Sequence, residues 1–339
     1  MKLLATPVPL RMPWVFPAVL IANTALVVIA RCEPTGGSDD PAVLTRLKHS
    51  RAVNAIVYCD GDVVITGCAD GALRAWDVAT GKTSKQLQVS NGKPFDELFW
   101  IARSRKEKAV FFSSQRTLQA WDMSLEKPSW QLRLDPPSCF NDLAISSSGR
   151  DLAVGNLNMD VLVLDSRNGK MKGTIKCQYA GVFVQSVQFA PDNKTVIVAY
   201  DNSHILIWST SEARGAEDFK VGNGILNRAL ASPDGKLLAI CFANDRAVHL
   251  WDFDKRSIVG QLIGHKGFPG GMLFMDNETL FTADTTGAVI RWDLKHSKAI
   301  RKYECDKRQA IDLAISPDLK RLAVACESGD VVIIDLTKP

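Results

Sequence analysis

The sequence is short of the residues and motifs from which active sites are usually assembled. It has five histidines, at positions 49, 204, 249, 265 and 296, and no GxSxG, HExxH or P-loop motif. Its eight cysteines, at positions 32, 59, 68, 139, 177, 241, 305 and 326, include no CxxC pair, so a zinc site is not expected. These absences argue against the common hydrolases and metalloenzymes, and we expect no cofactor.

Charge and composition exclude further classes. The chain has 41 Lys and Arg against 37 Asp and Glu, for a formal net charge of +4, and this imbalance is too small to indicate nucleic-acid binding. With 46% hydrophobic and 23% charged residues, the chain can bury a sizeable core. Most cysteines lie in apolar runs such as "LAVACESG", which predicts buried, unpaired thiols, with one disulfide as the alternative.

Only one long apolar run is present, at residues 14–30, "WVFPAVLIANTALVVIA". It follows Lys2 and Arg11 and is closed by Arg31, which predicts a signal peptide or signal anchor over residues 1–30. Residues 31–42, "RCEPTGGSDDPA", are typical of a polar linker. We therefore expect an exported or membrane-anchored protein whose membrane contact is limited to residues 1–31. A cytoplasmic protein with a misassigned start is the alternative, which the unpaired cysteines favour.

The rest of the chain, residues 43–339, is repetitive. Four Trp-Asp pairs, beginning at positions 76, 121, 251 and 292, each end a short alternating strand such as "GALRAWD". Degenerate pairs begin at positions 164, 208 and 334, so all seven units repeat every 41 to 45 residues, the length of a four-stranded propeller blade. Most units also contain a turn such as "SPDG" between two apolar runs, which predicts a tight hairpin.

These motifs resemble the WD40 repeat family over residues 43–338. The resemblance implies an all-β, seven-bladed β-propeller of four-stranded blades, monomeric and built to bind other proteins. It also implies a structural His–Asp–Ser/Thr–Trp network. The matching residues are His49, Thr66, Asp70 and Trp76 in blade 1, and His265, Thr282 and Trp292 in blade 6, where Thr286 replaces the turn Asp.

The last repeat lacks an outer strand, because the chain ends on "DVVIIDL". Residues 42–49, "AVLTRLKH", precede the first complete set of strands. Pairing them with the last strand would close the ring and remove two exposed sheet edges. We therefore predict that the N-terminal strand completes the seventh blade.

Two positions in each repeat predict a polar ring on one face. The first lies near the entrance of the first strand and comprises Asn54, Asp96, Asn141, Gln185, Asn227, Gly270 and Asp312. The second precedes the second turn and comprises Ala69, Ser114, Leu157, Asp201, Asn244, Thr285 and Glu327. The resemblance implies that these positions line the rim on which partners dock. Carboxamides can pair with a peptide backbone, and Asp and Glu with Lys or Arg, although such residues can also serve only their own loops.

The sequence therefore predicts a non-enzymatic scaffold that binds a protein or peptide. The alternative is a propeller enzyme of the lactonase, hydrolase or quinone-dependent type, acting on a small molecule in the central channel. Such an enzyme would need inward carboxylates and histidines around a metal, or an aromatic floor for its cofactor. The basic turn in "ARSRKEKAV", residues 102–110, is interpreted as a solvated hairpin rather than a nucleic-acid patch.

Overall fold

The structure, a computed structural model, describes residues 40–90, 98–114, 117–133, 140–156, 160–210 and 217–338. The regular secondary structure of these residues consists entirely of β-strands. The described residues belong to one compact unit. The predicted signal segment, residues 1–30, and most of the predicted linker lie outside them.

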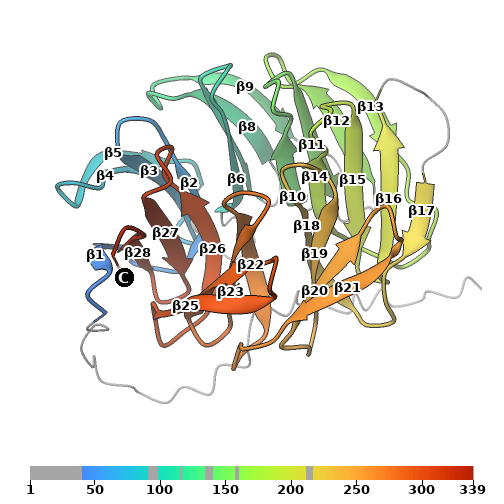
Figure 1. The fold of residues 1–339 in the computed structure, drawn as a ribbon. Coiled ribbons are helices and arrows are strands. Elements are labelled where there is room, and N and C mark those ends of the chain that lie inside the picture. The colour runs from blue at the N-terminus through green and yellow to red at the C-terminus, as the bar shows by residue number, and fades with distance from the viewer. Residues whose placement is uncertain are drawn as a thin grey trace, which may run out of the picture. The chain divides into compact units, whose positions relative to one another are not determined.

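The strands form seven four-stranded antiparallel sheets arranged as a propeller, as the sequence predicted (Figure 1). The strands of each blade are given from the innermost outward. Blade 1 contains β2 (Val53–Tyr58), β3 (Val63–Cys68), β4 (Ala72–Asp77) and β5 (Lys82–Gln88), and blade 2 contains β6 (Leu98–Ser104), β7 (Ala109–Ser114), β8 (Thr117–Asp122) and β9 (Pro128–Arg133). Blade 3 contains β10 (Phe140–Ile145), β11 (Asp151–Asn156), β12 (Val161–Asp165) and β13 (Met171–Ile175).

Blades 4 to 6 repeat the same order. Blade 4 contains β14 (Val184–Phe189), β15 (Thr195–Tyr200), β16 (His204–Ser209) and β17 (Glu217–Lys220). Blade 5 contains β18 (Leu226–Ala231), β19 (Leu237–Phe242), β20 (Val248–Asp252) and β21 (Ser257–Leu262). Blade 6 contains β22 (Pro269–Phe274), β23 (Thr279–Asp284), β24 (Ala288–Asp293) and β25 (Lys298–Glu304).

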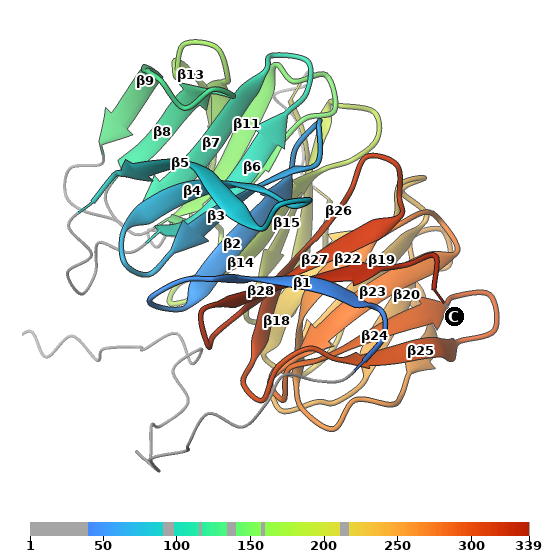
Figure 2. The same cartoon turned by 90° about the vertical axis from the view of Figure 1, so that its left-hand side faces the viewer.

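Blade 7 joins the two ends of the propeller and confirms the predicted closure. It contains β26 (Ala310–Ile315), β27 (Arg321–Cys326), β28 (Asp330–Asp335) and, as its outer strand, β1 (Val43–Lys48). Figure 2 shows β1 running beside β28, and the antiparallel register runs from Val43 opposite Ile334 to Lys48 opposite Asp330. The first described strand therefore covers what would otherwise be the open edge of β28.

The hydrophobic core lies between neighbouring blades. Seven clusters of buried side chains each join two adjacent sheets. The second strands are buried on both faces, which explains their continuous apolar runs, such as "RLAVAC" in β27. The six described cysteines are free thiols, and five of them are buried in this core. Burial raises the pKa of the Cys241 thiol to about 12, so that thiol stays protonated at neutral pH.

The hairpins between first and second strands contain a left-handed residue in every blade except blade 6. Gly235 ends the "SPDG" turn of blade 5 with φ +72°, and its N–H donates to the Ser232 carbonyl. In blade 7 the matching residue is Leu319, with φ +60° and the matching bond to Ser316. A leucine with positive φ is strained. The turn of blade 7 therefore adopts the same left-handed conformation as the turn of blade 5, although leucine does not favour it.

Candidate functional site

The innermost strand of each blade has one edge that faces the central channel. All seven of these strands carry a β-bulge at their second residue, where the register with the next strand shifts. The extra residue of a bulge is left without a partner in the ladder. The seven bulge residues are Asn54, Phe99, Asn141, Gln185, Asn227, Gly270 and Ile311.

Five members of the first predicted ring therefore occupy one structural position: Asn54, Asn141, Gln185, Asn227 and Gly270. Asp312 falls one residue later, since Ile311 is the bulge residue of blade 7. Asp96 lies outside the described residues. The bulge inserts a residue that simple strand alternation does not reveal, so the sequence aligned Asp312 with the position that precedes it.

Two of the ring carboxamides link neighbouring blades. The Nδ2 group of Asn54 donates to the carbonyl oxygen of Leu98 at 2.8 Å, and that of Asn141 donates to the carbonyl oxygen of Val184 at 3.0 Å. In both cases the acceptor is the first residue of the next blade's inner strand. These two side chains therefore satisfy backbone groups on an unpaired edge.

The third residue of the inner strand makes a related link. The N–H of Val187 donates to Asp142 Oδ2 at 2.8 Å, and the N–H of Ile56 donates to Asp312 Oδ2 at 3.0 Å. In blade 4 the hydroxyl of Ser186 plays the same part for Ala229, accepting from its N–H and donating to its carbonyl. A belt of polar side chains thus joins the inner strands of four neighbouring pairs of blades, namely 7 and 1, 1 and 2, 3 and 4, and 4 and 5.

The belt also contains one cation. Arg228 reaches from β18 to the Trp100 ring on β6, with 5.2 Å between its Cζ atom and the ring centroid. Blades 2 and 5 are not neighbours, so this cation–π contact crosses the channel. Burial raises the pKa of Asp142 to about 6, and the nearby Arg228 limits that rise. Burial likewise raises the pKa of Asp312, against the effect of Arg228.

These channel carboxylates bear on the enzyme alternative. Both oxygens of Asp142 accept backbone N–H groups, from Leu143 at 2.9 Å and from Val187, and Asp312 is bonded to Ile56. None of the described histidines belongs to the belt. Within the described ranges, no group of three or more His, Cys, Asp and Glu side chains is placed to hold a metal. The channel carboxylates therefore act as structural acceptors.

The second predicted ring lies on loops at the same face. The N–H groups of Ala69, Asp201, Thr285 and Glu327 each donate to the carbonyl oxygen of the residue just before the inner strand of their own blade. In blade 5 this bond is made by Ala243 to Ile225, so Asn244 lies one residue further along, with φ +64° and its side chain exposed. Ser114 is the last residue of β7 and buried. Leu157 is outside the described residues.

Exposed apolar side chains accompany this rim at blades 5 and 6. Ile225 is 61% exposed and Phe268 is 38% exposed, and each immediately precedes an inner strand. Arg246, in the β19–β20 turn, lies over the Phe268 ring with 5.9 Å from Cζ to the centroid. We call Ile225, Asn244, Arg246 and Phe268 the rim patch.

The structural network is complete in blade 6. His265 lies between Asp284 and Thr282, with Nδ1 2.8 Å from Asp284 Oδ2 and Nε2 2.6 Å from Thr282 Oγ1. Trp292 Nε1 donates to Thr282 Oγ1 at 2.7 Å. The sequence missed Asp284, because it lies two residues before Thr286, at the end of the strand rather than in the turn. Burial opposes ionisation of Asp284, but hydrogen bonds from His265 and Thr286 outweigh it and lower the pKa of that carboxyl.

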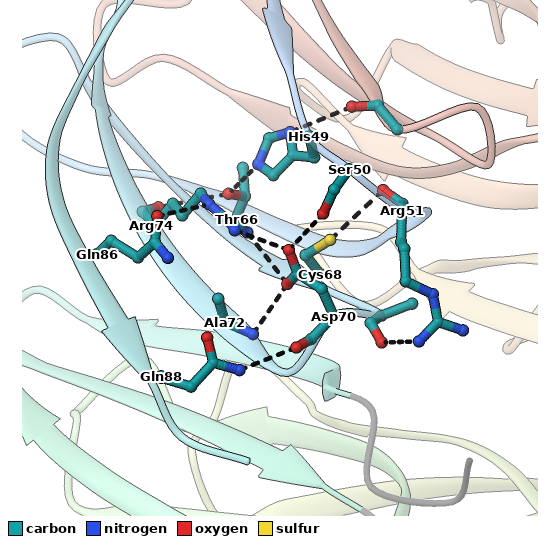
Figure 3. Close-up of polar contacts among 12 residues, drawn as sticks. His49, Ser50, Arg51, Thr66, Cys68, Asp70, Ala72, Arg74, Gln86 and Gln88 are labelled. Atoms are coloured by element: carbon teal, nitrogen blue, oxygen red, sulfur yellow. Dashed lines mark hydrogen bonds and ion pairs between the residues drawn. The ribbon is translucent and has the colours of Figure 1, made fainter. Parts of the chain in front are cut away.

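In blade 1 the network is divided, as Figure 3 shows. His49 Nε2 lies 2.8 Å from Thr66 Oγ1, which also accepts from Trp76 Nε1 at 3.1 Å. Asp70 instead accepts hydrogen bonds from Ser50 at 2.8 Å and from Arg74 at 2.7 Å. His49 turns its other nitrogen to the Gly329 carbonyl, at 3.2 Å. Burial, then Arg74, lowers the pKa of His49 to about 4.

The fold, the repeat register and the Trp–Thr–His contacts define a closed β-propeller of the WD type. The WD40 family, described as "WD domain, G-beta repeat", matches residues 42–77 and 169–209. This chain is a WD40-repeat protein, as the resemblance implied.

Two curated relatives support this membership. Protein groucho of Drosophila melanogaster is 26% identical over 169 residues, which cover 49% of this chain and 23% of that protein. Periodic tryptophan protein 2 of Arabidopsis thaliana is 20% identical over 317 residues, which cover 86% of this chain and 34% of that protein. The chain thus spans about a quarter to a third of the length of these relatives.

The expectations about membranes rest on the first residues of the chain. No helix long and apolar enough to cross a membrane occurs in the part of the chain that the structure describes. The apolar segment at residues 14–30 is not in that part. Export or anchoring through residues 1–31 therefore stays a prediction, with the cytoplasmic alternative beside it.

Proposed function

We propose that this propeller is a non-enzymatic scaffold that binds a protein or peptide on the rim at which the inner strands begin. One observation carries the proposal: on blades 4 to 6, unpaired carboxamides, exposed apolar side chains and a cation occur together. Among the described residues, the side chains of Gln185 and Asn227 form no hydrogen bond, unlike those of Asn54 and Asn141.

The chemistry of this sector suits an extended peptide. Gln185 and Asn227 each offer an amide donor and an acceptor to a peptide backbone. Ile225 and Phe268 of the rim patch offer apolar contact, and interface energy usually concentrates in a few such side chains. Asp201 and Glu327 lie on the same face and would pair with Lys or Arg of the partner.

The ring residues have different parts in this proposal. Asn54, Asn141 and Asp312 hold neighbouring blades together, so they would shape the rim rather than contact the partner. Gln185, Asn227, Asp201, Asn244 and Glu327 would make the contacts. Asp96 keeps its predicted role as a partner-binding residue of blade 2.

The experiment is affinity capture from cell extract, followed by quantitative mass spectrometry, with three forms of the chain. The test variant carries Ile225→Ser and Phe268→Ser. The control carries Ile258→Ser and Val259→Ser on outer strand β21, where the two side chains are 40% and 44% exposed. We expect the control to keep the partners of the wild type and the rim variant to lose them. Equal capture by both variants would move the site to another face.

A further inference from the structure

The opposite ends of the inner strands surround a chamber of about 790 Å³. All seven inner strands contribute to its lining, through their last residues and the turns that follow. Its wall includes the partly exposed side chains of Val57, Ile145, Phe189, Leu273 and Ile315. These positions follow the polar belt along the same strands, so the channel is polar near the rim and apolar at this end.

A contact between two side chains crosses the channel between the rim and the chamber. Arg228 and Trp100 are third residues of their strands, and their contact spans the channel. The chamber lining starts at the fourth residue, with Ile56 and Leu313. The chamber is therefore entered from the face opposite the rim patch, and a partner bound at the rim would leave that entrance free.

The charged residues that line the chamber are all basic. The described lining residues include Arg103, Arg105 and Lys106 but neither Asp nor Glu. Arg103 already has partners within the protein, because it donates to the Tyr58 carbonyl at 2.8 Å and to Asp60. Arg105 and Lys106 are exposed in the β6–β7 turn and form no ion pair with another described residue. The solvated hairpin predicted from "ARSRKEKAV" thus places two available cations at the mouth of an apolar chamber.

We propose that this chamber binds a small organic acid with an apolar body, whose chain or ring lies against the wall while its acid group pairs with Arg105 and Lys106. The volume is within the range of roughly 300–1,000 Å³ typical of small-molecule sites. Apolar walls with a few charged groups at one side are also typical of such sites. The charge of the lining selects an anion over a cation with the same apolar tail.

Isothermal titration calorimetry with decanoate, and with decylammonium as the matched cation, tests the proposal on the full chain. We expect one decanoate per chain and no saturable binding of decylammonium. Arg105→Glu with Lys106→Glu should weaken decanoate binding about tenfold or more, since each exposed pairing is worth up to about 1 kcal/mol and reversal also adds repulsion. The control is Lys194→Glu with Lys320→Glu, which also replaces two cations by two anions. Both residues are exposed in turns on the chamber's face of the propeller but do not line the chamber. This control should change the affinity for decanoate less than about twofold.

A second variant tests the chamber itself. Ala231 lines it, and Ala231→Phe should abolish decanoate binding while the melting temperature shows that the propeller still folds. The proposal is overturned if decanoate does not bind, if decylammonium binds as tightly, or if the charge-reversal pair leaves the affinity unchanged. Binding of a capped acidic peptide in place of decanoate would assign the chamber to a protein segment and would also overturn it.

Discussion

Replacing Thr282 with Val tests the blade 6 network with almost no change of shape. Thr282 Oγ1 accepts from Trp292 Nε1 at 2.7 Å and lies 2.6 Å from His265 Nε2. Thr282 is fully buried, Trp292 is 1% exposed and His265 is 6% exposed, so water cannot replace the lost oxygen. An unsatisfied buried polar group costs about 1–3 kcal/mol, and Thr282→Val leaves two, so we expect a loss of roughly 2–6 kcal/mol in the free energy of unfolding.

Urea unfolding, followed by circular dichroism, measures this loss as a lower midpoint at unchanged slope. The control is Thr279→Val in the same strand, because the Thr279 hydroxyl forms no hydrogen bond with a described residue. We expect that control to stay within about 0.5 kcal/mol of the wild type. If Thr282→Val is no more destabilising than Thr279→Val, the network does not stabilise blade 6.

Three further predictions follow from the fold. Deleting residues 42–49 removes the strand that covers β28 together with the buried Leu47, and should make the protein insoluble or cost at least about 3 kcal/mol; an unchanged melting temperature would refute the closure. Leu319→Gly should stabilise by about 0.5–1 kcal/mol, because glycine adopts positive φ without strain, and Leu319→Ala should give no such gain in the same thermal melts. Burial raises the pKa of Asp142 to about 6, so its ionised form destabilises the folded state fully above pH 6, and this penalty fades as the pH falls toward that of unfolded Asp. As the pH falls through this window, the wild type should therefore become more stable relative to Asp142→Asn, by up to about 1.4 kcal/mol per pH unit. Parallel pH profiles of stability for the two proteins would contradict the buried-carboxyl account.

The sequence was sufficient for the architecture because the architecture repeats. Each strand that ends in Trp-Asp, or in a degenerate copy, marks one blade, and even the copies at Leu164 and Ile334 keep the spacing. The incomplete last repeat pointed to β1 as the missing strand. Local periodicity and ring closure therefore predicted the blade number and the pairing of β1 with β28.

The site was harder to predict because it depends on contacts between blades. The β-bulge changes which residue of each inner strand faces the channel, so Asp312 was assigned to the wrong register while Asn54 was not. Nothing in the sequence showed that Asn141 would bond to the next blade while Asn227 would stay unpaired. Asp284 was missed because the network needs a carboxylate within reach of His265, not one at a fixed place in the repeat.

The chamber illustrates the same limit. Its wall comes from the ends of seven strands that are about forty residues apart in sequence. Six of them contribute ordinary apolar residues, and β6 contributes only charged and polar ones. The charged turn of blade 2 was visible in the sequence, but its position at the mouth of a cavity follows only from ring closure.

Photo-cross-linking tests the central claim, that partners bind at the rim, most directly. A photoreactive amino acid at Asn227, on the rim side of β18, is compared with one at Lys194, in a turn at the opposite ends of the strands. We predict that irradiation in cell extract links a partner to position 227 and that added Ile225→Ser with Phe268→Ser removes this adduct. An adduct at position 194 but none at position 227 would contradict the account.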